Sequence, residues 1–230
     1  RIRFGESVSE TCSELNTGKS IAETGSKADV NLKTNTATND HAMRDMRINV
    51  PFYGQTEVGN TGFRFVRIDL LTPGQTICLK EATAILRYRD IPYVGAFRCS
   101  DARLNDIWMT GAYTVHLNMQ EYIWDGVKRD RLVWLGDMHP ETNTIATVFG
   151  DNDSFYSTLD LACQQYPSTR WLNDMSAYSL WYLIIQHDWY MHFGHKAFLQ
   201  RHANYIASLI DKIDSCIDDN GNDNMGWRFL

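Results

Sequence analysis

The amino-acid sequence predicts a fold in two parts, a β-sandwich followed by a series of helices. Short apolar alternations separated by polar turns fill residues 1–95, the apolar period then changes to three- and four-residue steps, and no strand pattern returns before residue 230. Helices joined by short loops pair antiparallel, and such pairs build a bundle, a solenoid or part of an α/α toroid. We therefore assign 1–95 to a β-sandwich domain and 96–230 to a helical domain.

Strand patterns define the first domain. "RIRFGESVSE" at 1–10, "FRFVRIDLL" at 63–71 and "ATAILRYRD" at 82–90 place apolar residues between polar ones, as half-buried strands do. Residues 16–47 are rich in Asn, Thr, Ser, Gly and Lys, which fits long loops on a sandwich or a flexible insertion.

Helical patterns define the second domain. The segment 100–122 is amphipathic and begins with Ser100 and Asp101, a typical N-cap. Further helices are expected over 139–149, 153–165, 174–193 and 196–217. Pro140 suits a first helical turn, and Asp153 or Ser154 is expected to cap the helix at 153.

Composition excludes several function classes. The net charge is −6 and no tract of Lys or Arg supplies the basic face that nucleic acid requires. No apolar run reaches the roughly 18 residues of a membrane span. The chain begins at Arg1 and shows no leader, so localisation stays open, and a periplasmic or extracellular place is compatible with the sequence.

The cysteines and histidines predict no metal and no cofactor. Five cysteines show no paired metal spacing, and their odd number leaves at least one unpaired, so buried free thiols are expected. The histidines never form the H-E-x-x-H arrangement, and no glycine-rich phosphate loop or G-x-S-x-G elbow is present.

The stretch "DGVKRDRLVWLGD" at 125–137 concentrates opposed charges around Trp134. On a helix, Asp130, Trp134 and Asp137 would share one face, so that carboxylates flank an indole ring. Carboxylates bind sugar hydroxyls and an indole covers the C–H face of a pyranose, which makes a sugar the best-fitting ligand. An exposed charged turn anchored by Trp134 and Leu132 explains the same residues without a site.

This stretch resembles the signature of family 78 glycoside hydrolases, the α-L-rhamnosidases, in which Asp-Gly-x-x-Arg-Glu/Asp-Arg precedes Trp, Gly and Asp. "RIRFGES", "GFRFVRI" and "GAFRCSDARLNDIW" also resemble segments of that family. The resemblance implies a β-sandwich followed by the first part of an (α/α)6 toroid. It also implies hydrolysis of terminal α-L-rhamnosides in glycosides or polysaccharides, with inversion by two carboxylic acids.

The resemblance assigns roles by position. Asp130 falls on the general-acid position, where the family carries Glu, one methylene longer. Asp125, Trp134 and Asp137 fall on sugar-binding positions. The family's general base comes from the later half of the toroid, so these 230 residues alone are expected to be inactive.

Five more residues complete the predicted sugar site. Arg129 adjoins the acid, His139 and Glu141 follow the motif, and Trp171 with Asp174 is expected to form a second wall. His139 and Glu141 are explained nearly as well by a polar helix start. Two rival functions stay open: a catalytically silent carbohydrate-binding homologue, and an inverting toroid hydrolase that acts on another deoxyhexose or a uronide.

Overall fold

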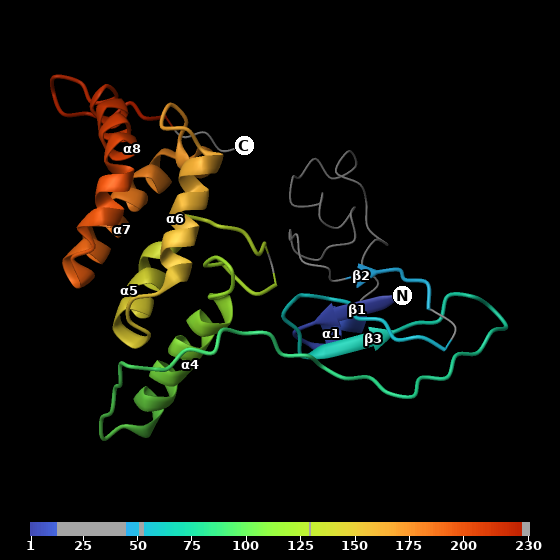
Figure 1. The fold of residues 1–230 in the computed structure, drawn as a ribbon. Coiled ribbons are helices and arrows are strands. Elements are labelled where there is room, and N and C mark those ends of the chain that lie inside the picture. The colour runs from blue at the N-terminus through green and yellow to red at the C-terminus, as the bar shows by residue number, and fades with distance from the viewer. Residues whose placement is uncertain (13–44, 51–52, 129, 227–230) are drawn as a thin grey trace. The chain divides into compact units, whose positions relative to one another are not determined.

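The computed structural model describes residues 1–12, 45–50, 53–128 and 130–226. The chain splits into two compact units, of which unit 1 comprises Arg1–Leu86 with Gly126–Leu132, and unit 2 comprises Arg87–Asp125 with Val133–Leu230. Unit 1 contains the strands and unit 2 the long helices (Figure 1). The division of the chain into domains at residue 95 stays a prediction.

A three-stranded antiparallel sheet forms the centre of unit 1. Its strands are β1 (Ile2–Gly5), β2 (Asp45–Met46) and β3 (Phe65–Ile68), in the order β2-β1-β3, and a short helix α1 (Val8–Cys12) follows β1. Ile2 pairs with Met46 on one side and Ile68 on the other. The predictions of strands near 1–10 and 63–71 are therefore confirmed.

Within the described residues, no second sheet faces this one, so the β-sandwich stays a prediction. The strand expected over 82–90 is wrong, because these residues join no ladder. Ile85 and Leu86 are 57% and 65% exposed, so the alternating apolar residues have no buried face to fill. Most of the polar segment 16–47 lies outside the described residues.

Five long helices build unit 2: α4 (Ala102–Asn118), α5 (Met138–Val148), α6 (Asp153–Gln165), α7 (Ser176–Phe193) and α8 (Lys196–Asp214). They confirm the predicted helices to within a few residues. Asp101 caps α4 by accepting a hydrogen bond from the Arg103 amide at 2.9 Å, as expected. The cap of α6 is Asn152, not Asp153 or Ser154, because its extended backbone lets the side chain accept from the Ser154 amide at 3.0 Å.

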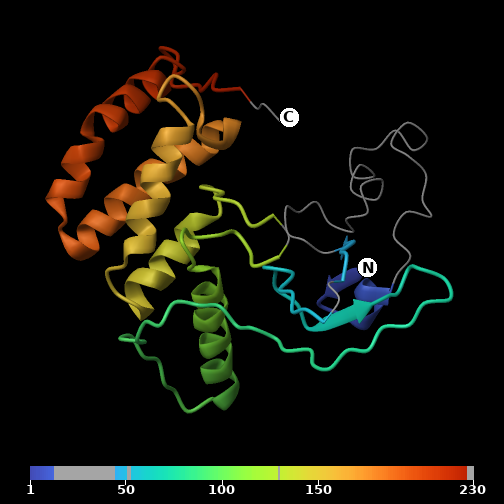
Figure 2. The same cartoon turned by 45° about the vertical axis from the view of Figure 1, so that its right-hand side comes forward.

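The helices pack on a continuous apolar core. α5 packs most extensively against α7, α4 packs against α5, and α7 forms a hairpin with α8 (Figure 2). Gly194 ends α7 in the left-handed conformation that such a turn requires. The rings of Phe155 in α6 and Trp189 in α7 stack with their centroids 3.8 Å apart. Trp189 and Tyr182 are buried in this core, whereas Trp181 is half-buried at its edge.

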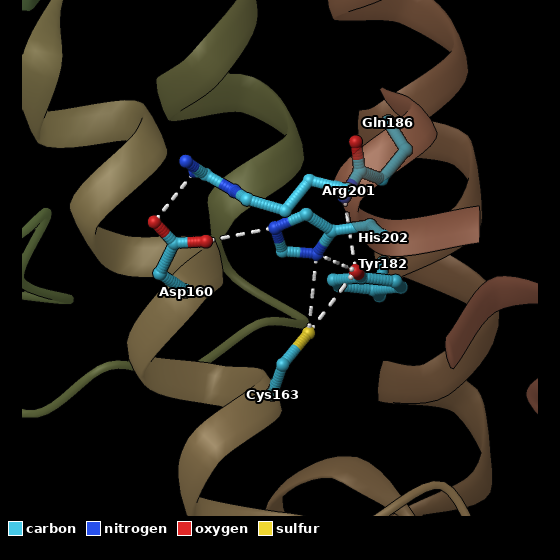
Figure 3. Close-up of polar contacts among 6 residues, drawn as sticks. All are labelled: Asp160, Cys163, Tyr182, Gln186, Arg201 and His202. Atoms are coloured by element: carbon cyan, nitrogen blue, oxygen red, sulfur yellow. Dashed lines mark hydrogen bonds and ion pairs between the residues drawn. The ribbon is translucent and has the colours of Figure 1, made fainter. Parts of the chain in front are cut away.

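A buried polar network joins α6, α7 and α8 within this core (Figure 3). His202, which is 4% exposed, bonds to the Asp160 carboxylate through Nε2 at 2.8 Å and to the Tyr182 hydroxyl through Nδ1 at 2.8 Å. The Cys163 thiol lies 3.3 Å from Nδ1, and the Gln186 amide donates to the Tyr182 oxygen at 2.9 Å. Each buried polar group of this network therefore has a hydrogen-bond partner, and the network fixes the three helices in position along one another.

The cysteines are all free thiols, as expected, but the expectation that they are buried is wrong. Cys12 and Cys78 are exposed and the other three are intermediate. Burial raises the pKa of Cys163 to about 11, so this thiol is un-ionised at neutral pH and a poor nucleophile despite its contact with a histidine. In the part of the chain that the structure describes, no helix is long and apolar enough to cross a bilayer. No group of three or more metal-binding side chains occurs in those ranges either.

The network predicts a large cost for removing its central ring. His202→Ala should lower the free energy of unfolding by about 2–4 kcal/mol, because it leaves buried partners without hydrogen bonds. His195→Ala is the matched control, since His195 is 46% exposed and pairs with Asp151 at the surface; its cost should stay below about 1 kcal/mol. Urea denaturation of both variants measures the difference, and equal costs would contradict the structural role of the network.

Candidate active site

The motif at 125–137 lies in an irregular connection between α4 and α5. The helical arrangement considered for Asp130, Trp134 and Asp137 is therefore wrong. The connection begins with a tight reversal, in which the Asn118 carbonyl accepts from the amides of Gln120 at 3.1 Å and Trp124 at 3.0 Å. These bonds set where the chain leaves α4 and thereby place Asp125.

Asn173 holds the segment that carries Trp134. Its side chain accepts from the Leu135 amide at 3.1 Å and donates to the Val133 carbonyl at 2.9 Å, so it clamps the backbone on both sides of the indole. Asn173 lies in the short turn η1 (Leu172–Asp174) with φ 51° and ψ 23°, a left-handed conformation that Asn adopts more readily than most residues. The clamp therefore depends on the one residue type that supplies both the amide and the backbone geometry.

Tyr178, in the first turn of α7, packs against the same segment. Its ring meets the Trp134 ring edge to face, with centroids 6.2 Å apart. A Cβ added at Gly136 would lie 2.0 Å from the Tyr178 ring, so only glycine allows this approach. Trp134 remains half-buried rather than enclosed in the core, and Asp137 in the same turn is exposed.

Three carboxyl groups and one amide gather where α4 ends and α5 begins. Asp137 stands at the N-cap of α5 and Glu141 in its first turn. Burial, followed by repulsion from Asp137, raises the pKa of Glu141 from 4.5 to about 8; a hydrogen bond from the Asn118 side chain opposes the rise, and Asp125 adds a smaller repulsion. Glu141 is therefore a mostly neutral carboxylic acid at neutral pH.

His139, also in the first turn of α5, faces α7. Its Nε2 lies 3.0 Å from Asp188 and 3.1 Å from the Asn143 amide, and its ring lies 4.8 Å from that of Trp181. Hydrogen bonds from His187 and His139 lower the pKa of Asp188. His139 is therefore held by the α5–α7 contact.

The predicted second wall has partners of its own. Arg170 makes a bidentate ion pair with Asp174. The Lys212 ammonium lies 3.7 Å from the centre of the Trp171 ring and covers one of its faces. The role of Trp171 in a sugar site, like that of Asp174, stays a prediction.

The central part of the motif belongs to unit 1. Asp130 is buried, at 6% exposed. Lys128 pairs with Glu10 and lies 3.9 Å from Glu6, and Arg131 donates to the Asn60 carbonyl. These contacts tie Lys128 and Arg131 to residues of the sheet-bearing unit.

Arg129 lies outside the described residues. Unit 1 thus holds Asp130, and unit 2 holds the other predicted site residues: Asp125, Trp134, Asp137, His139, Glu141, Trp171 and Asp174. Their convergence on one concavity stays a prediction. The structure adds Asn118, Asn173 and Tyr178, which sequence reasoning missed. Each interacts with a residue that is distant in the sequence. Only the turn-forming pair Asn173–Asp174 gave a signal in the local sequence, and that signal indicated a turn.

Comparison with known proteins places this helical unit in a class. Residues 92–230 match the model of the bacterial α-L-rhamnosidase six-hairpin glycosidase domain, which covers more than half of the chain. The fold and the motif thus define a six-hairpin glycosidase domain. The chain belongs to the bacterial α-L-rhamnosidase family of glycoside hydrolases, which confirms the resemblance seen in the sequence.

A solved structure shares the fold of part of this chain. The crystal structure of a GH78 family rhamnosidase of Bacillus sp. GL1 superposes with a TM-score of 0.54 at 24% identity, over 62% of this chain. The match spans 16% of the length of that enzyme. No curated protein matches the chain.

The contact between Gly136 and Tyr178 predicts a position-specific substitution effect. Gly136→Ala should lower the free energy of unfolding by about 1–3 kcal/mol, because the new methyl displaces the Tyr178 ring and the segment behind it. Gly111→Ala is the control, because an added Cβ there meets nothing within 4 Å and α4 gains helix propensity. Chemical denaturation compares the two variants, and an unchanged Gly136→Ala protein would contradict this packing.

The raised pKa of Glu141 predicts how stability depends on pH. The unfolded chain releases this proton near pH 4.5 and the folded chain near pH 8, so the folded state binds more protons between these values. The contribution of Glu141 to the free energy of unfolding should therefore fall as pH rises from about 4.5 to 8. Urea denaturation across this window should show a shallower fall for Glu141→Gln, and the exposed Glu121→Gln should behave as the wild type.

Proposed function

We propose that the protein to which this chain belongs removes terminal α-L-rhamnose from glycosides or polysaccharides. The observation that carries the proposal is the family match over 92–230, together with a signature tryptophan that the structure leaves half-exposed in one turn with Asp137. Asp125, Trp134 and Asp137 bind the sugar ring, with His139, Glu141, Arg129, Trp171 and Asp174 around them.

The chemistry of these groups suits a neutral sugar. A half-exposed indole offers an apolar face to the C–H side of a pyranose, and carboxylate oxygens accept hydrogen bonds from its hydroxyl groups. Burial, together with repulsion from Asp137 and Asp125, already raises the pKa of Glu141. A uronate would add a further negative charge there, so the rival uronide hydrolase is disfavoured relative to a hydrolase for a deoxyhexose.

The proposed mechanism is inverting. Asp130 protonates the leaving oxygen, while a general base from another part of the whole protein activates water on the opposite face of the ring. In this class of mechanism the two carboxyl groups stand roughly 6.5–9.5 Å apart, which leaves room for the water. These 230 residues alone are therefore proposed to be inactive, and activity is a property of the whole protein.

The test is hydrolysis of aryl glycosides by the full-length protein. The wild type should release aglycone from the α-L-rhamnoside in preference to other deoxyhexosides and uronides, with inversion seen by NMR of the first product. Asp130→Asn should lower kcat by about 10²–10⁴-fold, because the amide has no proton to give, while the affinity for L-rhamnose stays within a few-fold.

Two variants sharpen this test. Asp130→Glu restores the longer family residue and should retain activity, whereas the exposed Asp106→Asn on α4 should leave kcat unchanged. A wild type that binds L-rhamnose without turnover would favour the silent binding homologue. Full activity of Asp130→Asn would remove this residue from the mechanism.

A further inference from the structure

Asn118 links Glu141 to the loop that carries a predicted sugar ligand. Its main-chain carbonyl holds the Trp124 amide at 3.0 Å, next to Asp125, while its side chain donates to the Glu141 carboxyl group. Asn118 is 6% exposed, so both bonds form in a region with little water. A change in the charge of Glu141 therefore acts directly on the residue that shapes this loop.

The surroundings of Glu141 oppose a negative charge. Its Oε2 is buried and, among the described residues, has no hydrogen-bond partner. The ionisable groups that act on it are Asp137 before α5 and Asp125 after α4, and both repel an anion. On the α7 side, the Asp188 carboxylate binds His139 and His187. A proton on Glu141 relieves the repulsion and removes the cost of a buried, unpaired charge.

We propose that Glu141 is a positioning residue that holds a proton during sugar binding, so that the site accepts its sugar in the neutral-Glu141 state. A sugar bound by Asp125 and Asp137 displaces water from the cluster. Because water is what stabilises an ionised Glu141, its displacement penalises the anion further. Sugar binding and the proton on Glu141 therefore favour each other.

The linkage has a defined sign. The ordinary pKa of the carboxyl group is 4.5 and its value in the fold is about 8, so the proton is present at neutral pH and is lost above about pH 8. Affinity for the sugar should be constant below that point. Above it, affinity should fall. The steepness of the fall should approach about a tenfold loss of affinity per pH unit, the limit for one linked proton.

This inference rests on the proposed function and is tested on the full-length protein with L-rhamnose as the probe. Calorimetric titration from pH 6 to 9.5 should show the fall in the wild type and a flat profile for Glu141→Gln, whose amide resembles the neutral acid. The exposed Glu121→Gln is the control and should follow the wild type. Asn118→Ala should move the fall to higher pH, because the lost hydrogen bond favoured the charged form.

A second measurement separates the two proposals. Difference infrared spectra of the wild type and Glu141→Gln should show a protonated-carboxyl band that disappears near pH 8 without sugar and at higher pH with L-rhamnose bound. Binding of L-rhamnose with the same pH profile in both proteins would overturn the linkage and leave the proposed function standing. Absence of L-rhamnose binding at every pH would overturn the proposed function and the linkage with it.

Discussion

The shape of the motif depends on side-chain hydrogen bonds to a backbone whose described residues form no helix and only an isolated strand bridge. Between α4 and α5 the chain runs through residues 119–137, and its peptide groups need partners that a ladder would otherwise supply. Thr158 of α6 accepts from the Ile123 amide at 2.8 Å, and Asn173 serves the amide and the carbonyl beside Trp134. A few polar side chains from the helical scaffold thus replace regular structure, and that of Asn173 holds the backbone on both sides of the indole.

The helices could be predicted because their signals are local. Apolar residues at three- and four-residue steps, a capping Asp101 and a left-handed Gly194 are all read from neighbouring positions. The cap at Asn152 was missed by one residue, since three capping residue types stand in a row at 152–154. The family itself was readable from one motif, because "DGVKRDRLVWLGD" resembles the signature of family 78 glycoside hydrolases.

The rest depended on distant contacts. Asn173 forms hydrogen bonds with residues 38 and 40 positions earlier in the chain, and no sequence pattern around Asn173 predicts these partners. The strand expected over 82–90 had the right alternation but lacked a neighbouring strand, which local periodicity cannot reveal.

The assignment of Gly126–Leu132 to the sheet-bearing unit limits how this protein can be dissected. The helical unit cannot be produced as one continuous polypeptide made only of its own residues, because these seven residues of unit 1 interrupt its sequence. A shortened gene that starts near Arg87 would still encode Lys128 and Asp130, but without the Glu10 carboxylate that partners the lysine. Swapping the N-terminal part between relatives would separate the same two charges, so the segment Gly126–Leu132 should be exchanged together with α1, which carries Glu10.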